Sequence, residues 1–171
     1  MRTLVLGGVR SGKSRLASRL AMGTGKRVVY VATARVLDEE TRARVESHKA
    51  SRPTHWEVIE EPLELASVVR RYAVEDAMVL VDCLTMWLAN LLEDSDSDLS
   101  PARDELYRAV NGCAADLVLV SNETNMGVMP AGELSRRFCD EAGLLHQQLA
   151  GCCDSVILTV AGLPYTLKSP P

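Results

Sequence analysis

The residues with the clearest chemistry lie near the N-terminus, in the sequence Gly7-Gly-Val-Arg-Ser-Gly-Lys-Ser14. A short apolar run, Thr3–Leu6, precedes them, and a helix-forming stretch, Arg15–Met22, follows. The pattern Gly-x-x-x-x-Gly-Lys-Ser between a strand and a helix is typical of a phosphate-binding loop, whose backbone N–H groups surround phosphate oxygens. Lys13 can reach the outer phosphates as a catalytic residue, and the Ser14 hydroxyl can bind Mg²⁺. We therefore expect a nucleoside triphosphate to be bound by Gly7, Gly8, Val9, Arg10, Ser11, Gly12, Lys13 and Ser14.

Two more strand ends carry candidate residues. Asp82 closes the apolar run Met78–Asp82. In an open parallel sheet, ligands bind beyond the carboxyl ends of the strands. A carboxylate there can bind Mg²⁺ opposite Ser14, although an aspartate that caps the next helix is the alternative. Four residues at the end of another apolar run could flank the nucleotide, namely Ala32, Thr33, Ala34 and Arg35.

The segment Arg44–Trp56 is rich in cations and holds two of the three histidines. Cations near a helix C-terminus often only complement the helix dipole, and that explanation remains open for Lys49 and Arg52. It explains His48 less well, because an imidazole among arginines keeps a nitrogen lone pair free and can attack phosphorus. Glu60, a little further on, could contact nucleotide or metal, with a solvent-exposed side chain as the alternative.

Apolar, β-branched runs alternate with helical stretches along the chain. We expect strands at Thr3–Leu6, Val28–Ala32, Met78–Asp82, Leu117–Ser121 and Val156–Val160, with a short extended piece near Trp56–Ile59. We expect helices at Arg15–Met22, Leu37–Lys49, Pro62–Tyr72, Leu84–Leu92, Ala102–Ala114 and Glu133–Ala150, the fifth capped near Ser100. This alternation predicts right-handed βαβ crossovers in a three-layer α/β fold with a mostly parallel central sheet. Residues 1–171 are expected to form a single domain.

Composition narrows the classes of function. The formal net charge of −4 argues against binding to a nucleic acid backbone. No apolar run is long enough for a membrane span, and no signal peptide is evident, so a cytoplasmic location is expected. The five cysteines show no zinc-binding spacing, and we expect buried free thiols.

The segment Asn122–Pro130 follows the end of another expected strand. We therefore expect it at the edge of the sheet where ligands bind. Gly127 would allow close approach of a substrate, and Glu123 could accept hydrogen bonds from one. His146 lies in an expected amphipathic helix, where a structural role is favoured over a catalytic one.

Nearly the whole chain resembles the bifunctional adenosylcobinamide kinase/adenosylcobinamide-phosphate guanylyltransferases of cobalamin synthesis. The resemblance depends most on His48-Lys-Ala-Ser-Arg-Pro-Thr-His-Trp56 and on Asn122-Glu-Thr-Asn-Met-Gly-Val-Met-Pro130, together with the loop at residues 7–14. It implies a P-loop fold of the recombinase-like type and a homotrimer.

The resemblance also implies two reactions at one nucleotide site. The first phosphorylates adenosylcobinamide with ATP or GTP. The second transfers GMP from GTP to adenosylcobinamide phosphate through a histidine–GMP intermediate at the position of His48, with release of pyrophosphate. Glu60 and Asp82 match nucleotide contacts of the family. A kinase limited to γ-phosphoryl transfer and a non-catalytic nucleotide-binding module are the alternatives.

Overall fold

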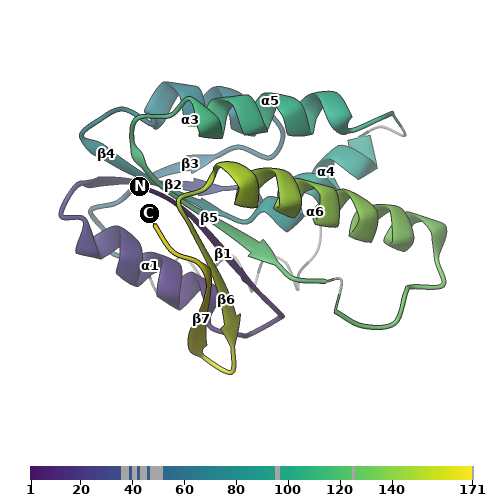
Figure 1. Ribbon diagram of the computed structural model, residues 1–171. Coiled ribbons are helices and arrows are strands. Elements are labelled where there is room, and N and C mark those ends of the chain that lie inside the picture. Colours follow the sequence, from purple (N-terminus) through teal and green to yellow (C-terminus); the bar gives the residue numbers. More distant parts are fainter. Residues whose placement is uncertain are drawn as a thin grey trace.

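The computed structural model describes residues 1–35, 39, 42, 46, 52–94, 97–124 and 126–170. Within these residues, seven strands form one sheet in the order β3-β2-β4-β5-β1-β6-β7 (Figure 1). The strands are β1 (Arg2–Gly7), β2 (Arg27–Ala32), β3 (Glu57–Glu60), β4 (Ala77–Asp82), β5 (Asp116–Asn122), β6 (Ser155–Val160) and β7 (Leu163–Lys168). Every neighbouring pair is parallel except β6 and β7, which are antiparallel. The expectation of a mostly parallel sheet is therefore confirmed.

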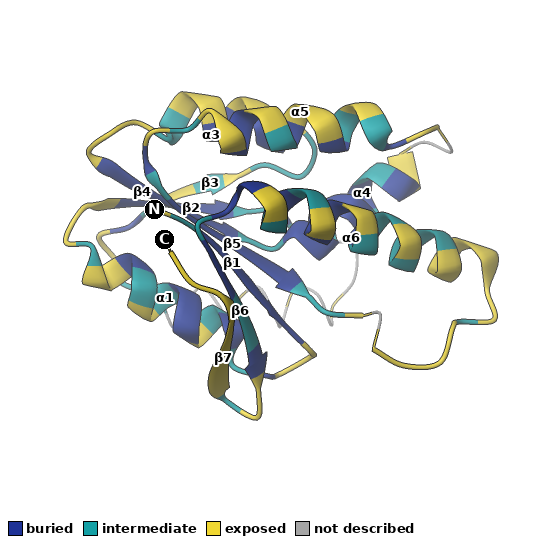
Figure 2. Ribbon diagram, viewed as in Figure 1, coloured by how far each residue is buried: buried dark blue, intermediate teal, exposed yellow. Residues whose placement is uncertain are grey.

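Helices cover both faces of the sheet, which gives three layers (Figure 1). The helices are α1 (Lys13–Gly23), α3 (Leu65–Tyr72), α4 (Leu84–Asp94), α5 (Ser100–Asn111) and α6 (Glu133–Cys152). Side chains alternate between the two faces along each strand, so one strand contributes to the hydrophobic cores on both faces of the sheet. Leu4 of β1 belongs to the core formed with residues of α3, α4, α5 and α6, whereas its neighbour Val5 belongs to the core formed with α1. Figure 2 shows the central strands as the buried middle layer, with β7 exposed.

The expected elements differ from the observed ones mainly at their ends. Helix α3 begins at Leu65 instead of Pro62, because Oε1 of Glu61 accepts hydrogen bonds from the backbone N–H groups of Leu63 and Glu64 and holds a turn there. Helix α5 begins at Ser100 instead of Ala102 and ends three residues early. Helix α6 runs two residues beyond Ala150. The expected helix Leu37–Lys49 lies almost entirely outside the described residues.

Strand β7 was not predicted at all. Its six residues are all exposed, so they lack the buried apolar run that marks the other strands. The strand forms because the chain reverses after β6 at Ala161 and Gly162, which have φ angles of 52° and 81°. This left-handed backbone suits glycine, and it sets β7 against β6 as an antiparallel edge strand.

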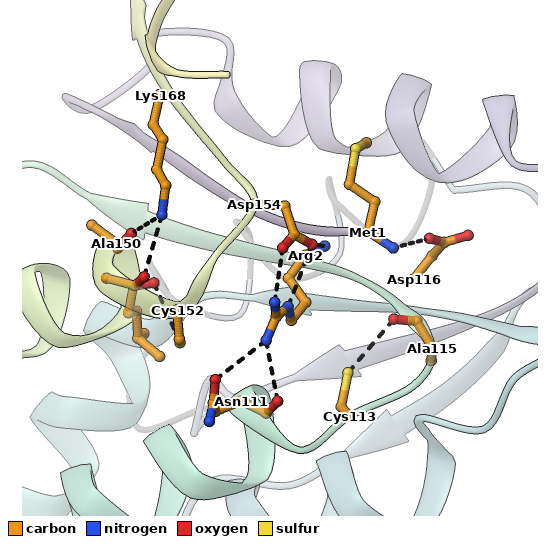
Figure 3. Close-up of polar contacts among 12 residues, drawn as sticks. Met1, Arg2, Asn111, Cys113, Ala115, Asp116, Ala150, Cys152, Asp154 and Lys168 are labelled. Carbon is orange, nitrogen blue, oxygen red and sulfur yellow. Dashed lines mark hydrogen bonds and ion pairs between the residues drawn. The ribbon is translucent and has the colours of Figure 1, made fainter. Parts of the chain in front are cut away.

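The amino ends of β1, β5 and β6 are held together by charged side chains (Figure 3). The guanidinium and the backbone N–H of Arg2 donate to the carboxylate of Asp154 at 2.8 and 2.7 Å. The amino group of Met1 pairs with Asp116. Hydrogen bonds from Arg2 hold the pKa of Asp154 at about 2, well below its ordinary value. These contacts lie at the amino ends of the strands, opposite the loop at residues 7–14. They therefore stabilise the fold at a distance from the expected site.

All five cysteines are free thiols, as expected. The expectation that they are buried is confirmed only for Cys152 and Cys153; the other three are partly exposed because they lie at element ends or on the outer side of α6. No helix in the described part of the chain is long and apolar enough to cross a membrane.

Candidate nucleotide-binding site

The loop at residues 7–14 connects β1 directly to α1, at the carboxyl edge of the sheet. Gly7 is buried where the two elements meet, and a Cβ atom there would lie 2.5 Å from both Ser11 Oγ and the Thr159 carbonyl oxygen. The Thr159 hydroxyl donates to the Leu6 carbonyl at 2.8 Å, which holds β6 close to the loop. The close packing therefore explains why this position has to be glycine.

Backbone bonds give the loop its shape. The Ser11 N–H donates to Gly8 O at 3.2 Å, and the Gly162 N–H donates to Ser11 O at 2.9 Å. Arg10 and Gly12 have φ angles of 55° and 97°, so the chain turns twice through left-handed backbone. The turn after β6 thus closes over the loop, and a Cβ on Gly12 would lie 3.2 Å from the Cα of Gly162. Gly162 was not predicted as part of the site, because its partner Ser11 lies near the other end of the sequence.

Lys13 begins α1 with its side chain almost fully buried, at 8% exposure. Its Nζ donates to the Gly8 carbonyl at 2.7 Å, so the ammonium group lies across the loop. Burial lowers the pKa of Lys13, and the nearby Cys83 and Asp82 oppose that shift. The Lys13 ammonium group therefore lies on the side of the loop near the end of β4.

Asp82 ends β4 and is half-buried. The phenol of Tyr30, on the neighbouring strand β2, donates to Asp82 Oδ2 at 3.2 Å. Burial and the adjacent carboxylate raise the pKa of Tyr30, so the phenol stays protonated and can keep donating. Tyr30 was not among the expected site residues, since its place inside a strand gave no sign of a polar contact.

An aromatic and cationic stack continues from Tyr30. Its ring lies stacked on Trp56, with centroids 6.3 Å apart, and the guanidinium carbon of Arg52 lies 4.1 Å from the Tyr30 centroid. The Arg52 guanidinium therefore lies against the same ring whose hydroxyl donates to Asp82. His48 and Lys49 lie outside the described residues.

The predicted residues at the carboxyl end of β2 lie beside Asp82. In the sheet register, Ala32 pairs with Asp82 on one side and with Glu60 on the other. Thr33 is buried, and its hydroxyl donates to Cys83 O at 2.7 Å while accepting from Cys83 N at 2.9 Å. The Thr33 side chain therefore ties β2 to β4. Glu60 is exposed on the outermost strand, and Ala34 is half-buried.

On the β5 side, the backbone N–H of Glu123 donates to Gly7 O at 2.9 Å. The Glu123 carboxylate lies 3.9 Å from Nδ1 of His146, and Nε2 of His146 is 2.7 Å from the Ser121 hydroxyl. Burial lowers the pKa of His146, and Glu123 partly opposes this. The expected structural role of His146 fits a buried imidazole of this kind, although its link to Glu123 was not foreseen.

The sheet topology and the strand–loop–helix connection define a P-loop fold of the recombinase-like type. A solved RadB recombinase matches it with a TM-score of 0.54 at 17% identity, covering 91% of this chain and 72% of that chain. A solved structure from Pyrococcus horikoshii OT3 matches with a TM-score of 0.56 at 11% identity, covering 98% and 86%. At such identities the likeness concerns the fold alone.

Sequence comparison identifies the family within that fold. Residues 3–167 match the model for the family described as cobinamide kinase / cobinamide phosphate guanyltransferase, so the chain belongs to that family. It is 52% identical to the bifunctional adenosylcobalamin biosynthesis protein CobP of Pseudomonas aeruginosa, covering 100% of this chain and 99% of that protein. It is 37% identical to the bifunctional adenosylcobalamin biosynthesis protein CobU of Escherichia coli K12, covering 98% and 100%. The resemblance stated from the sequence is confirmed.

Proposed function

We propose that this chain catalyses two successive transfers. It phosphorylates adenosylcobinamide with ATP or GTP, and it then transfers GMP from GTP to adenosylcobinamide phosphate, forming adenosylcobinamide-GDP and pyrophosphate. The observation that carries the proposal is the family match over residues 3–167, combined with a complete phosphate-binding loop at the sheet edge.

In the first reaction, the loop would hold the nucleotide phosphates. Backbone N–H groups at the start of α1 and the ammonium group of Lys13 would stabilise negative charge on the transferring phosphoryl group. The Lys13 bond to Gly8 O would be exchanged for one to a phosphate oxygen. The substrate hydroxyl oxygen forms the new bond to the γ-phosphorus, the bond to the β,γ-bridging oxygen breaks, and the hydroxyl proton is released.

The residues at the loop fit Mg²⁺. The Ser14 hydroxyl and the Asp82 carboxylate are hard oxygen donors, and both are half-buried at the same sheet edge. Among the described residues, no group of three His, Cys, Asp or Glu side chains could hold a metal. That agrees with an ion held by one or two protein oxygens together with substrate phosphates. When bound, Mg²⁺ would neutralise charge on the phosphates, while Tyr30 orients the Asp82 carboxylate.

In the second reaction, we assign the nucleophile to His48. An imidazole nitrogen would form a bond to the α-phosphorus of GTP as the bond to the β-phosphate breaks and pyrophosphate leaves. A phosphate oxygen of adenosylcobinamide phosphate would then displace the imidazole. Arg52, four residues further along the chain, lies at the Asp82 edge, which supports placing this basic segment at the nucleotide. Lys49, Arg52 and Glu60 are proposed to contact the nucleotide.

A labelling experiment tests the second reaction directly. The protein is incubated with Mg²⁺ and GTP radiolabelled at its α-phosphate, and an acid-labile, alkali-stable label should form on the wild type. The variant His48→Ala should lose the label and retain corrinoid phosphorylation. The variant His55→Ala is the matched control, since His55 is exposed and nearby in sequence. An unlabelled wild type under conditions of turnover would disprove the intermediate.

Two simpler functions make different predictions. A kinase limited to γ-phosphoryl transfer would release no pyrophosphate from GTP and cobinamide phosphate. A regulatory nucleotide-binding module would show no corrinoid-dependent turnover of any nucleotide. Measuring both products separates the three possibilities in one assay.

We further propose that the chain works in the cytoplasm, as one domain in a homotrimer, without a nucleic acid partner. The trimer follows from the family resemblance, and the acidic net charge of −4 disfavours nucleic acid. Sedimentation equilibrium would measure the mass of the assembly, and titration with DNA at low salt would test the second point.

A further inference from the structure

An open groove lies between the segment after β5 and the outer face of α6, with a volume of about 440 Å³. Gly127, Val128 and Met129 line one side, and Asp140, Leu144 and Gln147 of α6 line the other. This volume lies within the range of about 300–1,000 Å³ that is usual for small-molecule sites. None of the contacts described for the nucleotide loop uses these side chains.

Three apolar side chains that line the groove are exposed. Val128 is 97% exposed and Met129 60%, and Leu144 faces them with 46% exposure. Covering such side chains with a ligand is favourable, because it removes apolar surface from water. Gln147 and Asp140 add exposed amide and carboxylate groups at the rim. The combination suits a ligand with a broad apolar body whose edge carries amide groups.

The position of the groove connects it to the phosphate loop. It begins at Thr124, the residue after Glu123, whose backbone N–H is bonded to Gly7 O. Contacts already described hold two other parts of this end of the sheet. Gly162 closes over the loop from β6, and Tyr30 lies against Asp82. An acceptor that has to meet the transferring phosphorus can therefore approach from the β5 side.

We propose that this groove is the corrinoid subsite. It would hold one edge of the corrin ring system, with the corrin amides at Gln147 and Asp140 and the aminopropanol arm directed along Glu123 toward the loop. This assignment rests on the proposed function and adds to it the surface that recognises the acceptor. A different occupant of the groove, such as a second copy of the chain, would not require the groove to lie beside the phosphate loop.

The test uses the full-length protein and two separate variants, Val128→Asp and Met129→Asp. Because both side chains are exposed, the fold should be kept, which circular dichroism and the thermal midpoint would verify. The KM for adenosylcobinamide should rise about tenfold to a hundredfold, with the KM for the nucleotide unchanged. Val74→Asp and Met22→Asp are matched controls, because these residues are 48% and 51% exposed on other surfaces.

The outcomes separate the inference from the function on which it depends. If the wild type shows no corrinoid-dependent turnover, the proposed function fails. If the wild type turns over and both variants keep the wild-type KM for adenosylcobinamide, the function stands and the subsite is wrong. If the variants instead lower the mass of the assembly in sedimentation, the groove is an interface between copies, and the subsite is again wrong.

Discussion

The phenol of Tyr30 donates a hydrogen bond of 3.2 Å to Oδ2 of Asp82, and this contact joins strand β2 to the candidate metal-binding carboxylate on β4. The same ring lies under the guanidinium of Arg52 and against the indole of Trp56. The orientation of the Asp82 carboxylate therefore depends on the packing of the segment that follows the basic stretch around His48.

Replacing Tyr30 with phenylalanine should remove the hydrogen bond to Asp82 and keep the ring contacts. Losing a partner that orients a metal ligand weakens metal affinity, so the Mg²⁺ concentration for half-maximal activity should rise about tenfold. The stability should change by only about 1 kcal/mol. The measurement is a Mg²⁺ titration of nucleotide turnover, with Tyr107→Phe on α5 as a control. An unchanged Mg²⁺ requirement would show that Tyr30 has no orienting role.

Glycine should be essential at Gly7 and dispensable for folding at Gly8. An added Cβ at Gly7 would lie 2.5 Å from the Thr159 carbonyl oxygen, which is backbone and cannot move aside easily. At Gly8 an added Cβ meets nothing within 4 Å. Chemical unfolding without nucleotide should show Gly7→Ala destabilised by about 1–3 kcal/mol and Gly8→Ala within about 0.5 kcal/mol of wild type. Equal effects at the two positions would contradict the packing described here.

The variant Lys13→Met should bind nucleotide poorly and lose turnover. The methionine retains most of the buried side-chain volume, but it supplies no charge to the phosphates. We expect kcat for corrinoid phosphorylation to fall by about 10²–10³-fold, the range found when one donor to a developing charge is removed. Lys26→Met serves as the control, since Lys26 pairs with Asp116 at the opposite edge of the sheet. A rate close to wild type in Lys13→Met would exclude the catalytic role of this lysine.

His146 should make the protein less stable as the pH falls below about 6.5. Burial lowers its pKa in the folded state, so between the two pKa values the unfolded chain binds more protons. The stabilisation is therefore complete above the ordinary pKa of 6.5 and is lost as the pH falls through the folded value. Unfolding free energies between pH 8 and pH 5 should show this slope in the wild type, and a weaker slope in His146→Gln.

The window above pH 5 keeps the carboxylate of Asp154 out of this measurement. Asp154 has a pKa of about 2, and its contribution is lost only at more acidic pH. The variant His55→Gln provides the control, because it makes the same substitution at an exposed histidine. A wild-type slope that survives in His146→Gln would mean that another group titrates in this range.

Much of this protein could be predicted from local sequence. The phosphate loop is recognisable because its residues are contiguous and each has a backbone or charge role. The parallel strands are recognisable because both their faces are buried, which leaves continuous apolar runs. Asp82 was placed at the ligand edge by the rule that strand ends share that edge, and the structure pairs it with Ala32 and, through Ala32, with Glu60. The family followed from two short motifs of unusual composition.

Other features were decided only by the tertiary structure. Gly162 closes over Ser11, Tyr30 bonds to Asp82, and His146 joins Ser121 to Glu123, each across many residues of chain. Strand β7 has no apolar signature, and it exists because a left-handed turn directs it onto β6. The sequence by itself determined which groups could act on phosphate, since that depends on residue type and local spacing. The three-dimensional fold decided which partners orient those groups, because such contacts depend on strand register and on turns that bring distant residues together.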